Sequence, residues 1–138
     1  MAQIVAQAVK HSDSEKITIN VGYVDLGHID LLVREGFYAN RTDLIRTAIR
    51  NQISSHSETL RQTVSRRSLV LGIHHYSKHD LEAARQRGEL LQIQVLGLAS
   101  IADDVSPALA LKTIESIVVL GSLHAPAGVK RALASRIR

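Results

Sequence analysis

The stretch that decides the fold of the first part of this chain is residues 16–53, KITINVGYVDLGHIDLLVREGFYANRTDLIRTAIRNQI. It opens with strict alternation of polar and apolar residues over positions 16–21, which is typical of a β-strand with one polar and one apolar face. A single strand can neither bury its apolar face nor pair its backbone groups. No second alternating segment lies within hairpin distance. The sequence therefore predicts that this strand pairs with the same strand of another chain.

Two short helices are expected after the strand. The first carries apolar residues at helical spacing, and Gly36 stands where such a helix would end. Asn40 then resembles an N-cap, with Asp43 three residues later in a pattern close to a capping box. The apolar positions are Leu26, Ile29, Leu32 and Val33 in the first helix and Leu44, Ile45, Ala48, Ile49 and Ile53 in the second.

The order, spacing and cap of these segments resemble the ribbon-helix-helix (CopG/Arc/MetJ-like) family of DNA-binding proteins. The family's turn before the second helix has a small polar residue, a basic residue, Ser or Thr, and an acid, which matches Asn40-Arg41-Thr42-Asp43. The resemblance covers residues 15–53. It implies an intertwined dimer that lays a two-stranded ribbon in the major groove. The alternative is an ordinary helical hairpin preceded by an edge strand.

The resemblance also implies roles for individual residues. The base contacts would come from Lys16, Thr18 and Asn20. The phosphate contacts would come from Asn40, Arg41 and Thr42. Apart from the resemblance, Lys10 could reach the DNA backbone from an N-terminal arm, as arms do in several DNA binders, and the alternative is a tail without a role. The core shared by the two chains would contain Ile17, Ile19, Val21, Leu26, Ile29, Val33, Phe37, Leu44, Ile45 and Ile49.

Composition excludes several functional classes. The 138-residue chain has no cysteine and no tryptophan, so disulfides, thiolate metal sites and extended stacking platforms are excluded. No nucleotide-binding or nucleophile motif is present, and neither a cofactor nor an enzyme activity is expected. No membrane span is expected. The interpretation is a cytoplasmic, nucleoid-associated protein.

The charge of the chain permits DNA binding without requiring it. The net charge is +4, but residues 1–53 hold as many bases as acids. The bases are Lys10, Lys16, Arg34, Arg41, Arg46 and Arg50, and the acids are Asp13, Glu15, Asp25, Asp30, Glu35 and Asp43. Affinity would therefore depend on where groups are placed rather than on bulk charge.

An internal repeat dominates the second half. The tripeptide Val-Leu-Gly occurs at residues 70–72, 95–97 and 119–121, at spacings of 25 and 24 residues. Each copy lies in a β-prone run that a helix-prone run follows, which favours a small β–α repeat with a solenoid-like arrangement. A compact βαβαβα layer is the structural alternative, and chance recurrence of a common tripeptide is the simplest one.

The expected organisation is an α+β chain of four parts. Residues 1–14 form a flexible arm, 15–53 the DNA-binding domain, 54–67 a linker or helix extension, and 68–138 a repeat domain. Since little sequence remains to cap the last repeat, this domain is expected to oligomerise the protein.

Two polar clusters in the second half invite a metal-site interpretation. His74, His75 and His79 lie close together beside Asp80, and Asp103-Asp104 precede a proline. A polar loop between strand and helix explains the first better, and a helix N-terminus explains the second. No metal is expected.

The function that best fits the sequence is a sequence-specific transcriptional regulator, in particular a repressor, acting as a homodimer or higher oligomer on double-stranded DNA. The first alternative is a DNA-organising or plasmid-partition (centromere-binding) protein. The second is an antitoxin-like protein-interaction module.

Overall fold

A computed structural model describes residues 14–138, which form a mixture of helices and strands. The chain divides into two compact units, Met1–His56 and Ser57–Arg138. The predicted arm, apart from its last residue, and the predicted phosphate contact Lys10 lie outside the described residues.

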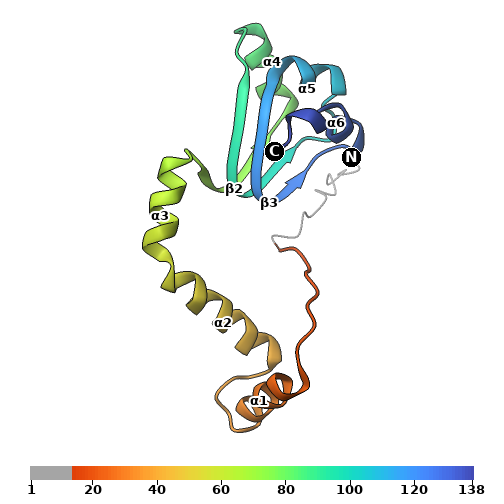
Figure 1. Cartoon of the computed structure of the whole chain (residues 1–138). Coiled ribbons are helices and arrows are strands. Elements are labelled where there is room, and N and C mark those ends of the chain that lie inside the picture. The colour runs from red at the N-terminus through yellow and green to blue at the C-terminus, as the bar shows by residue number, and fades with distance from the viewer. Residues whose placement is uncertain (1–13) are drawn as a thin grey trace, which may run out of the picture. The chain divides into compact units, whose positions relative to one another are not determined.

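The first unit contains the two predicted helices, α1 (Tyr23–Arg34) and α2 (Arg41–Ser55) (Figure 1). Helix α1 ends at its C-cap, Glu35, and Gly36 follows with φ of 84°. Glycine adopts this left-handed conformation without a Cβ penalty, so the chain can leave the helix there. Asn40 is the N-cap of α2, as predicted.

The predicted strand at residues 16–21 is not present in the single chain. These residues have no regular secondary structure, and the described residues contain one sheet, which is parallel and belongs to the second unit. A strand that pairs only with another molecule would have no backbone groups to pair with in one chain. The ribbon itself stays a prediction.

The second unit begins with α3 (Ser57–Arg66), which occupies most of the segment predicted as a linker or helix extension. Strands and helices then alternate: β1 (Val70–Tyr76), α4 (Lys78–Gln86), β2 (Leu91–Ile101), α5 (Pro107–Thr113), β3 (Ile114–His124) and α6 (Ala127–Ala132). The strands form a parallel three-stranded sheet in the order β1-β2-β3. This is a compact β–α layer, and a solenoid is not seen.

The Val-Leu-Gly repeat is explained by the register of this sheet. The three valines, the three leucines and the three glycines each form a row across the strands. Val95 is buried, whereas Leu71 and Leu120 are exposed on the opposite face. Val95 and Val119 thus belong to the core or pack against it, whereas Val70 in the edge strand is 49% exposed. Each copy also supplies one leucine to the opposite face and one glycine to the glycine row.

The glycine row requires residues without a Cβ. Gly72, Gly97 and Gly121 have φ values of 122°, 138° and 122°. A Cβ on Gly97 would collide with the carbonyl oxygen of Gly72, and one on Gly121 would collide with that of Gly97. The strands thus approach each other closely at a backbone conformation that L-residues rarely adopt.

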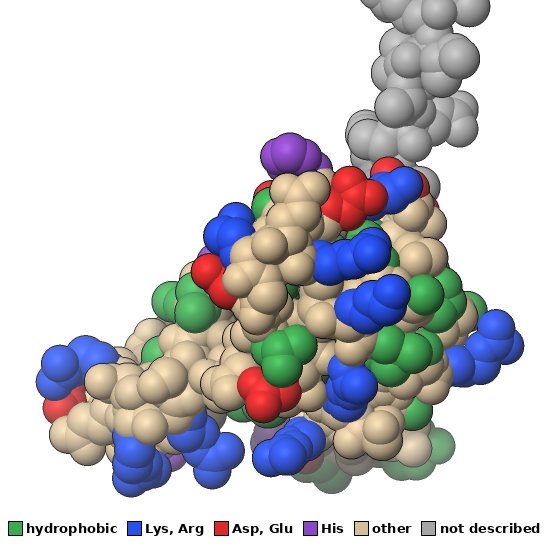
Figure 2. Space-filling view, turned by 90° about the horizontal axis from the view of Figure 1, so that it is seen from above, with side chains coloured by type: hydrophobic (Ala, Val, Ile, Leu, Met, Phe, Trp, Pro, Cys, Tyr) green, Lys and Arg blue, Asp and Glu red, His purple; other side chains and the backbone are tan. Residues whose placement is uncertain are grey.

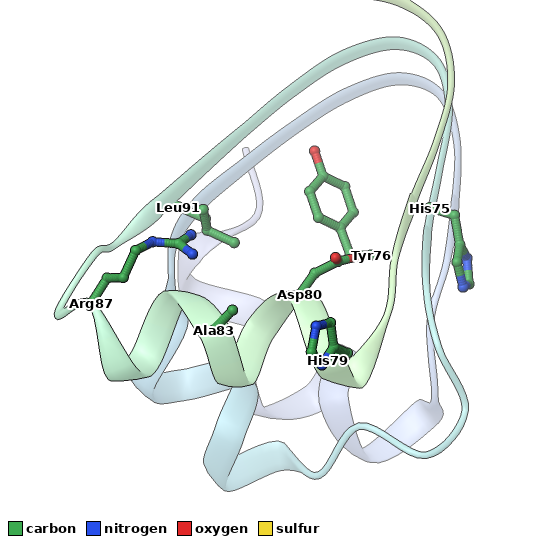
Figure 3. A pocket seen from close by; sticks show the side chains of 7 residues that line it. All are labelled: His75, Tyr76, His79, Asp80, Ala83, Arg87 and Leu91. Atoms are coloured by element: carbon green, nitrogen blue, oxygen red, sulfur yellow. The ribbon is translucent and has the colours of Figure 1, made fainter.

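The core lies between the sheet and three helices. Helices α4, α5 and α6 lie on one side of the strands, which arch over them in Figure 3, and α5 contacts both other helices. The fully buried side chains at its centre include Leu81 of α4, Ile93 of β2, Ile117 of β3 and Val129 of α6. The other face of the sheet has no helix of this unit packed upon it.

The C-terminal end differs from the sequence-based expectation of an uncapped repeat. A 3-10 turn, η1 (Ala134–Arg136), follows α6, and Ile137 forms a parallel bridge with Ile117 at the free edge of β3. The Arg136 guanidinium donates to the carbonyl oxygens of Leu111 and Ile114, both at 2.7 Å. The last residues therefore cover this edge at Ile117, which a pattern based on the repeat alone could not predict.

The expectation of a loop around the histidines is also corrected. His74 and His75 lie within β1 rather than after it, and only His79 lies in α4. The strand is longer than predicted because both histidines have parallel partners in β2, Ala99 and Ser100.

Candidate nucleic-acid interface

The apolar side chains of the first unit lack a core. No residue of α1 or α2 is buried. Ile17 is 76% exposed, Ile19 67% and Phe37 72%, and the other predicted core positions are exposed or half-buried. Side chains of this size are seldom left in water in such number, so the described residues of this unit, 14–56, do not by themselves bury their apolar surface.

The predicted base-reading residues alternate with these apolar positions. Lys16, Thr18 and Asn20 are all exposed, and none makes a hydrogen bond or ion pair with another residue of the described chain. Their donors and acceptors are therefore available to an external partner. Ile17 and Ile19 between them present the apolar side of the same segment.

The start of α2 is built as predicted. The Asn40 side chain accepts a hydrogen bond from the Asp43 backbone N–H at 2.8 Å. The Asp43 carboxylate in turn accepts from the backbone N–H of Ala39 at 3.0 Å. These two hydrogen bonds hold the first turn of the helix. The first turn of a helix leaves backbone N–H groups without intrahelical partners, and such groups can bind an anion.

Arg41 has a structural partner that sequence analysis missed. Its guanidinium donates to both carboxylate oxygens of Asp30 in α1, at 2.7 and 2.8 Å. The hydrogen bond from Arg41 lowers the pKa of Asp30, and the same bond raises the pKa of Arg41. The pair links the first turn of α2 to α1. The two residues lie eleven positions apart on different helices, so helical spacing gave no signal for it.

Figure 2 shows, on one face, Lys and Arg side chains lying among hydrophobic and polar side chains. The sequence of residues 1–53 holds as many bases as acids. Recognition at the first unit would depend on the placement of a few groups.

A cavity of about 440 Å³ lies beside α4 in the second unit (Figure 3). Tyr76, Arg87 and Leu91 point toward it, whereas His75 points away. Burial raises the pKa of the Tyr76 hydroxyl. Asp80 and Ser77 form the capping box at the start of α4. The hydrogen bonds with Ser77 lower the pKa of Asp80. Asp80 therefore has a structural role here.

The histidines are not arranged as a metal site. His75 Nδ1 lies 2.7 Å from the hydroxyl of Ser100 in the neighbouring strand. Within residues 14–138, no group of three or more His, Asp or Glu residues is placed to hold a metal ion. No helix in this part of the chain is long and apolar enough to cross a membrane.

The comparisons with known proteins gave one match. The model of a protein family described as the Ribbon-Helix-Helix transcriptional regulator family matches residues 12–130, which is most of the chain and includes both units. No curated protein and no solved structure matches.

Proposed function

Because the chain belongs to the ribbon-helix-helix transcriptional regulator family, we propose that it is a sequence-specific DNA-binding regulator that represses transcription as a homodimer or higher oligomer. The family supports the coarser statement of a DNA-binding transcriptional regulator, and such regulators are typically dimeric and not enzymes. The observation that carries the proposal is the absence of any buried residue in α1 and α2.

Two chains pair residues 16–21 as antiparallel strands in this proposal. Ile17, Ile19 and Val21 then lie on one face of the two-stranded ribbon. The α1 and α2 helices of both chains pack against that face. This arrangement removes the exposed apolar side chains from water. At about 25 cal/mol per Å² of apolar area, their burial is a strong driving force for pairing.

The opposite face of the ribbon enters the major groove. Lys16 suits guanine, Asn20 suits adenine, and Thr18 can serve either base or meet a thymine methyl group. Each good contact of this kind contributes roughly 1–3 kcal/mol of discrimination. Thr18 lies between the other two on the polar face, so a short base sequence is read.

The start of α2 holds the DNA backbone. Outward N–H groups in the first turn, near Asn40, Arg41 and Thr42, grip a phosphate on each side of the ribbon. The Arg41 side chain remains paired with Asp30 and keeps this turn in place. Lys10 adds a phosphate contact from the N-terminal arm.

In this proposal, transcription is repressed because the bound dimer occupies the DNA. A dimer bound in the groove competes with polymerase for the same DNA, and this mechanism needs no catalytic group. Linked dimers raise the effective concentration at neighbouring sites, so weak single-site binding becomes tight.

The test is selection of bound sequences from random DNA with the full chain, followed by titration of the selected site with wild type and Thr18→Ala. A short selected motif that Thr18→Ala binds more weakly supports the proposal. Binding without sequence preference would contradict it. Long cooperative footprints would instead support the DNA-organising alternative, and co-purification of a toxin the antitoxin-like one.

A further inference from the structure

The uncovered face of the parallel sheet carries a continuous apolar surface, here called the open face. It consists of the outward-pointing positions of the three strands. Leu71, Leu96 and Leu120 form one row across the sheet, and Ile73 and Leu98 form most of the next. Val118 extends the surface along β3.

These side chains take no part in the core. None of the six belongs to the buried cluster between the sheet and α4, α5 and α6. Leu71 is 70% exposed, Ile73 63% and Leu120 49%. A shallow hollow lined by Leu69, Gln94, Val118 and Leu120, with Arg67 at its border, lies on the same surface.

A parallel sheet with one apolar face in water is unusual. Parallel sheets occur almost only where both faces are covered. The helices of this unit cover one face, and the apolar rows of the other show that it too is built to be covered. We infer that the open face packs against the open face of a second copy of this chain.

Charge and symmetry favour a second copy over a different partner. Two rows cross the middle of this face: Leu71, Leu96 and Leu120, and Ile73, Leu98 and Ser122. Neither row contains Lys, Arg, Asp or Glu, so two identical faces can meet there without placing like charges together. A ligand such as nucleic acid would need several cationic groups there, and the residues that line the hollow include only one cation, Arg67. A strongly acidic or basic protein partner would likewise meet little complementary charge.

A second copy is also supplied at high concentration. The proposed ribbon joins two chains, and each brings its own sheet. Once the ribbon has joined two chains, pairing of their two sheets takes place within one tethered pair. The effective concentration of one sheet near the other is then roughly millimolar for short linkers. The inference rests on the proposed function only for this tether, not for the apolar face itself.

The experiment uses the full chain in sedimentation velocity, with the ribbon disabled by Ile19→Asp. If the open faces pair, Ile19→Asp remains a dimer. Adding Leu71→Lys and Leu120→Lys should make it a monomer, because burying these cations is costly and should raise the dissociation constant about tenfold or more. Both leucines are exposed in the single chain, so the unit should still fold.

Leu90→Lys in the same Ile19→Asp background is the matched control. Leu90 is 57% exposed, lies between α4 and β2, and is not part of the open face. This control should remain a dimer, and circular dichroism should show the same sheet content for all variants. An Ile19→Asp chain that stays monomeric up to roughly millimolar concentration, the level that the tether supplies, would overturn the inference, as would a dimer that survives both lysines. Failure of the proposed function would look different: Ile19→Asp would bind DNA like wild type.

Cross-linking gives an independent measurement because the chain has no cysteine of its own. Leu98→Cys, in the central strand of the open face, should be cross-linked between copies by a short bifunctional maleimide. Leu111→Cys, an exposed position on α5, should not be. Equal cross-linking of the two variants, or none of Leu98→Cys, would count against face-to-face packing.

Discussion

Gly97 lies in the central strand, where a side chain would meet the backbone of the neighbouring strand. Gly97→Ala should therefore lower the free energy of unfolding by more than the roughly 1–3 kcal/mol expected from its positive φ alone. Gly72→Ala is the control, because Gly72 has a similar φ but open space at the Cβ position. Chemical denaturation of both variants separates the collision from the strain. Equal losses would show that the close approach of the strands is not a constraint.

Replacement of Asn20 tests the predicted contacts with DNA bases most specifically. Asn20→Ala should leave folding unchanged, since the side chain is exposed and makes no contact that stabilises the single chain. Binding to the selected DNA should weaken by roughly 1–3 kcal/mol, with relaxed preference at one base pair. Fluorescence anisotropy with the selected site and with single-base variants measures both effects. Wild-type affinity in Asn20→Ala would show that the strand register or the groove assignment is wrong.

At the scale of elements, the Asn40 cap determines where α2 begins. Asn40→Ala removes the acceptor for the Asp43 N–H and should cost about 1 kcal/mol of stability. Asn40→Asp keeps an acceptor at the helix N-terminus and should restore most of it. Thermal unfolding of the three proteins provides the comparison. An Asn40→Ala protein as stable as wild type would indicate that the Asp43 side chain alone suffices.

Helix α4 offers a test by pH. Hydrogen bonds from Ser77 lower the pKa of Asp80 below its ordinary value of 3.8. A carboxyl with a lowered folded-state pKa stabilises the fold at pH values above its unfolded pKa, and this contribution is lost as the pH falls through the folded pKa. Acid below pH 3.8 should therefore release the cap. In a side-chain NMR titration, the wild-type Asp80 pKa should lie below 3.8. Ser77→Ala keeps the backbone N–H that is the main cause, so it should move the pKa only part of the way upward. A wild-type pKa at or above 3.8 would contradict the assignment.

Local sequence signals predicted most elements of this chain. Helical spacing, the Asn40 cap and Gly36 located the first two helices, and the Val-Leu-Gly repeat located all three strands. The order of strands in the sheet and the closure of its edge by Ile137 could not be predicted, because they depend on contacts between distant segments. The Arg41–Asp30 pair was missed for the same reason. The ribbon is a different case, since its predicted partner is another molecule.

At the scale of the whole molecule, the two units should respond independently to damage in the ribbon. Ile19→Asp places a charge in a core built from two chains, and symmetry doubles the effect. We expect loss of DNA binding by at least about tenfold, the change that corresponds to about 1.4 kcal/mol. The second unit should keep its thermal transition, since its buried cluster contains no residue of the first. Unfolding of both units together in this variant would show that they are not separate.

The most direct test of the central claim is an isotope-filtered NMR measurement on a mixture of labelled and unlabelled chains, bound to the selected DNA. The account predicts contacts between chains among the backbone protons of residues 16–21, in the antiparallel pattern, together with contacts from the Thr18 and Asn20 side chains to major-groove base protons. If the chains show no such contacts while the DNA remains bound, residues 16–21 do not form the ribbon, and the proposed mode of DNA recognition is wrong.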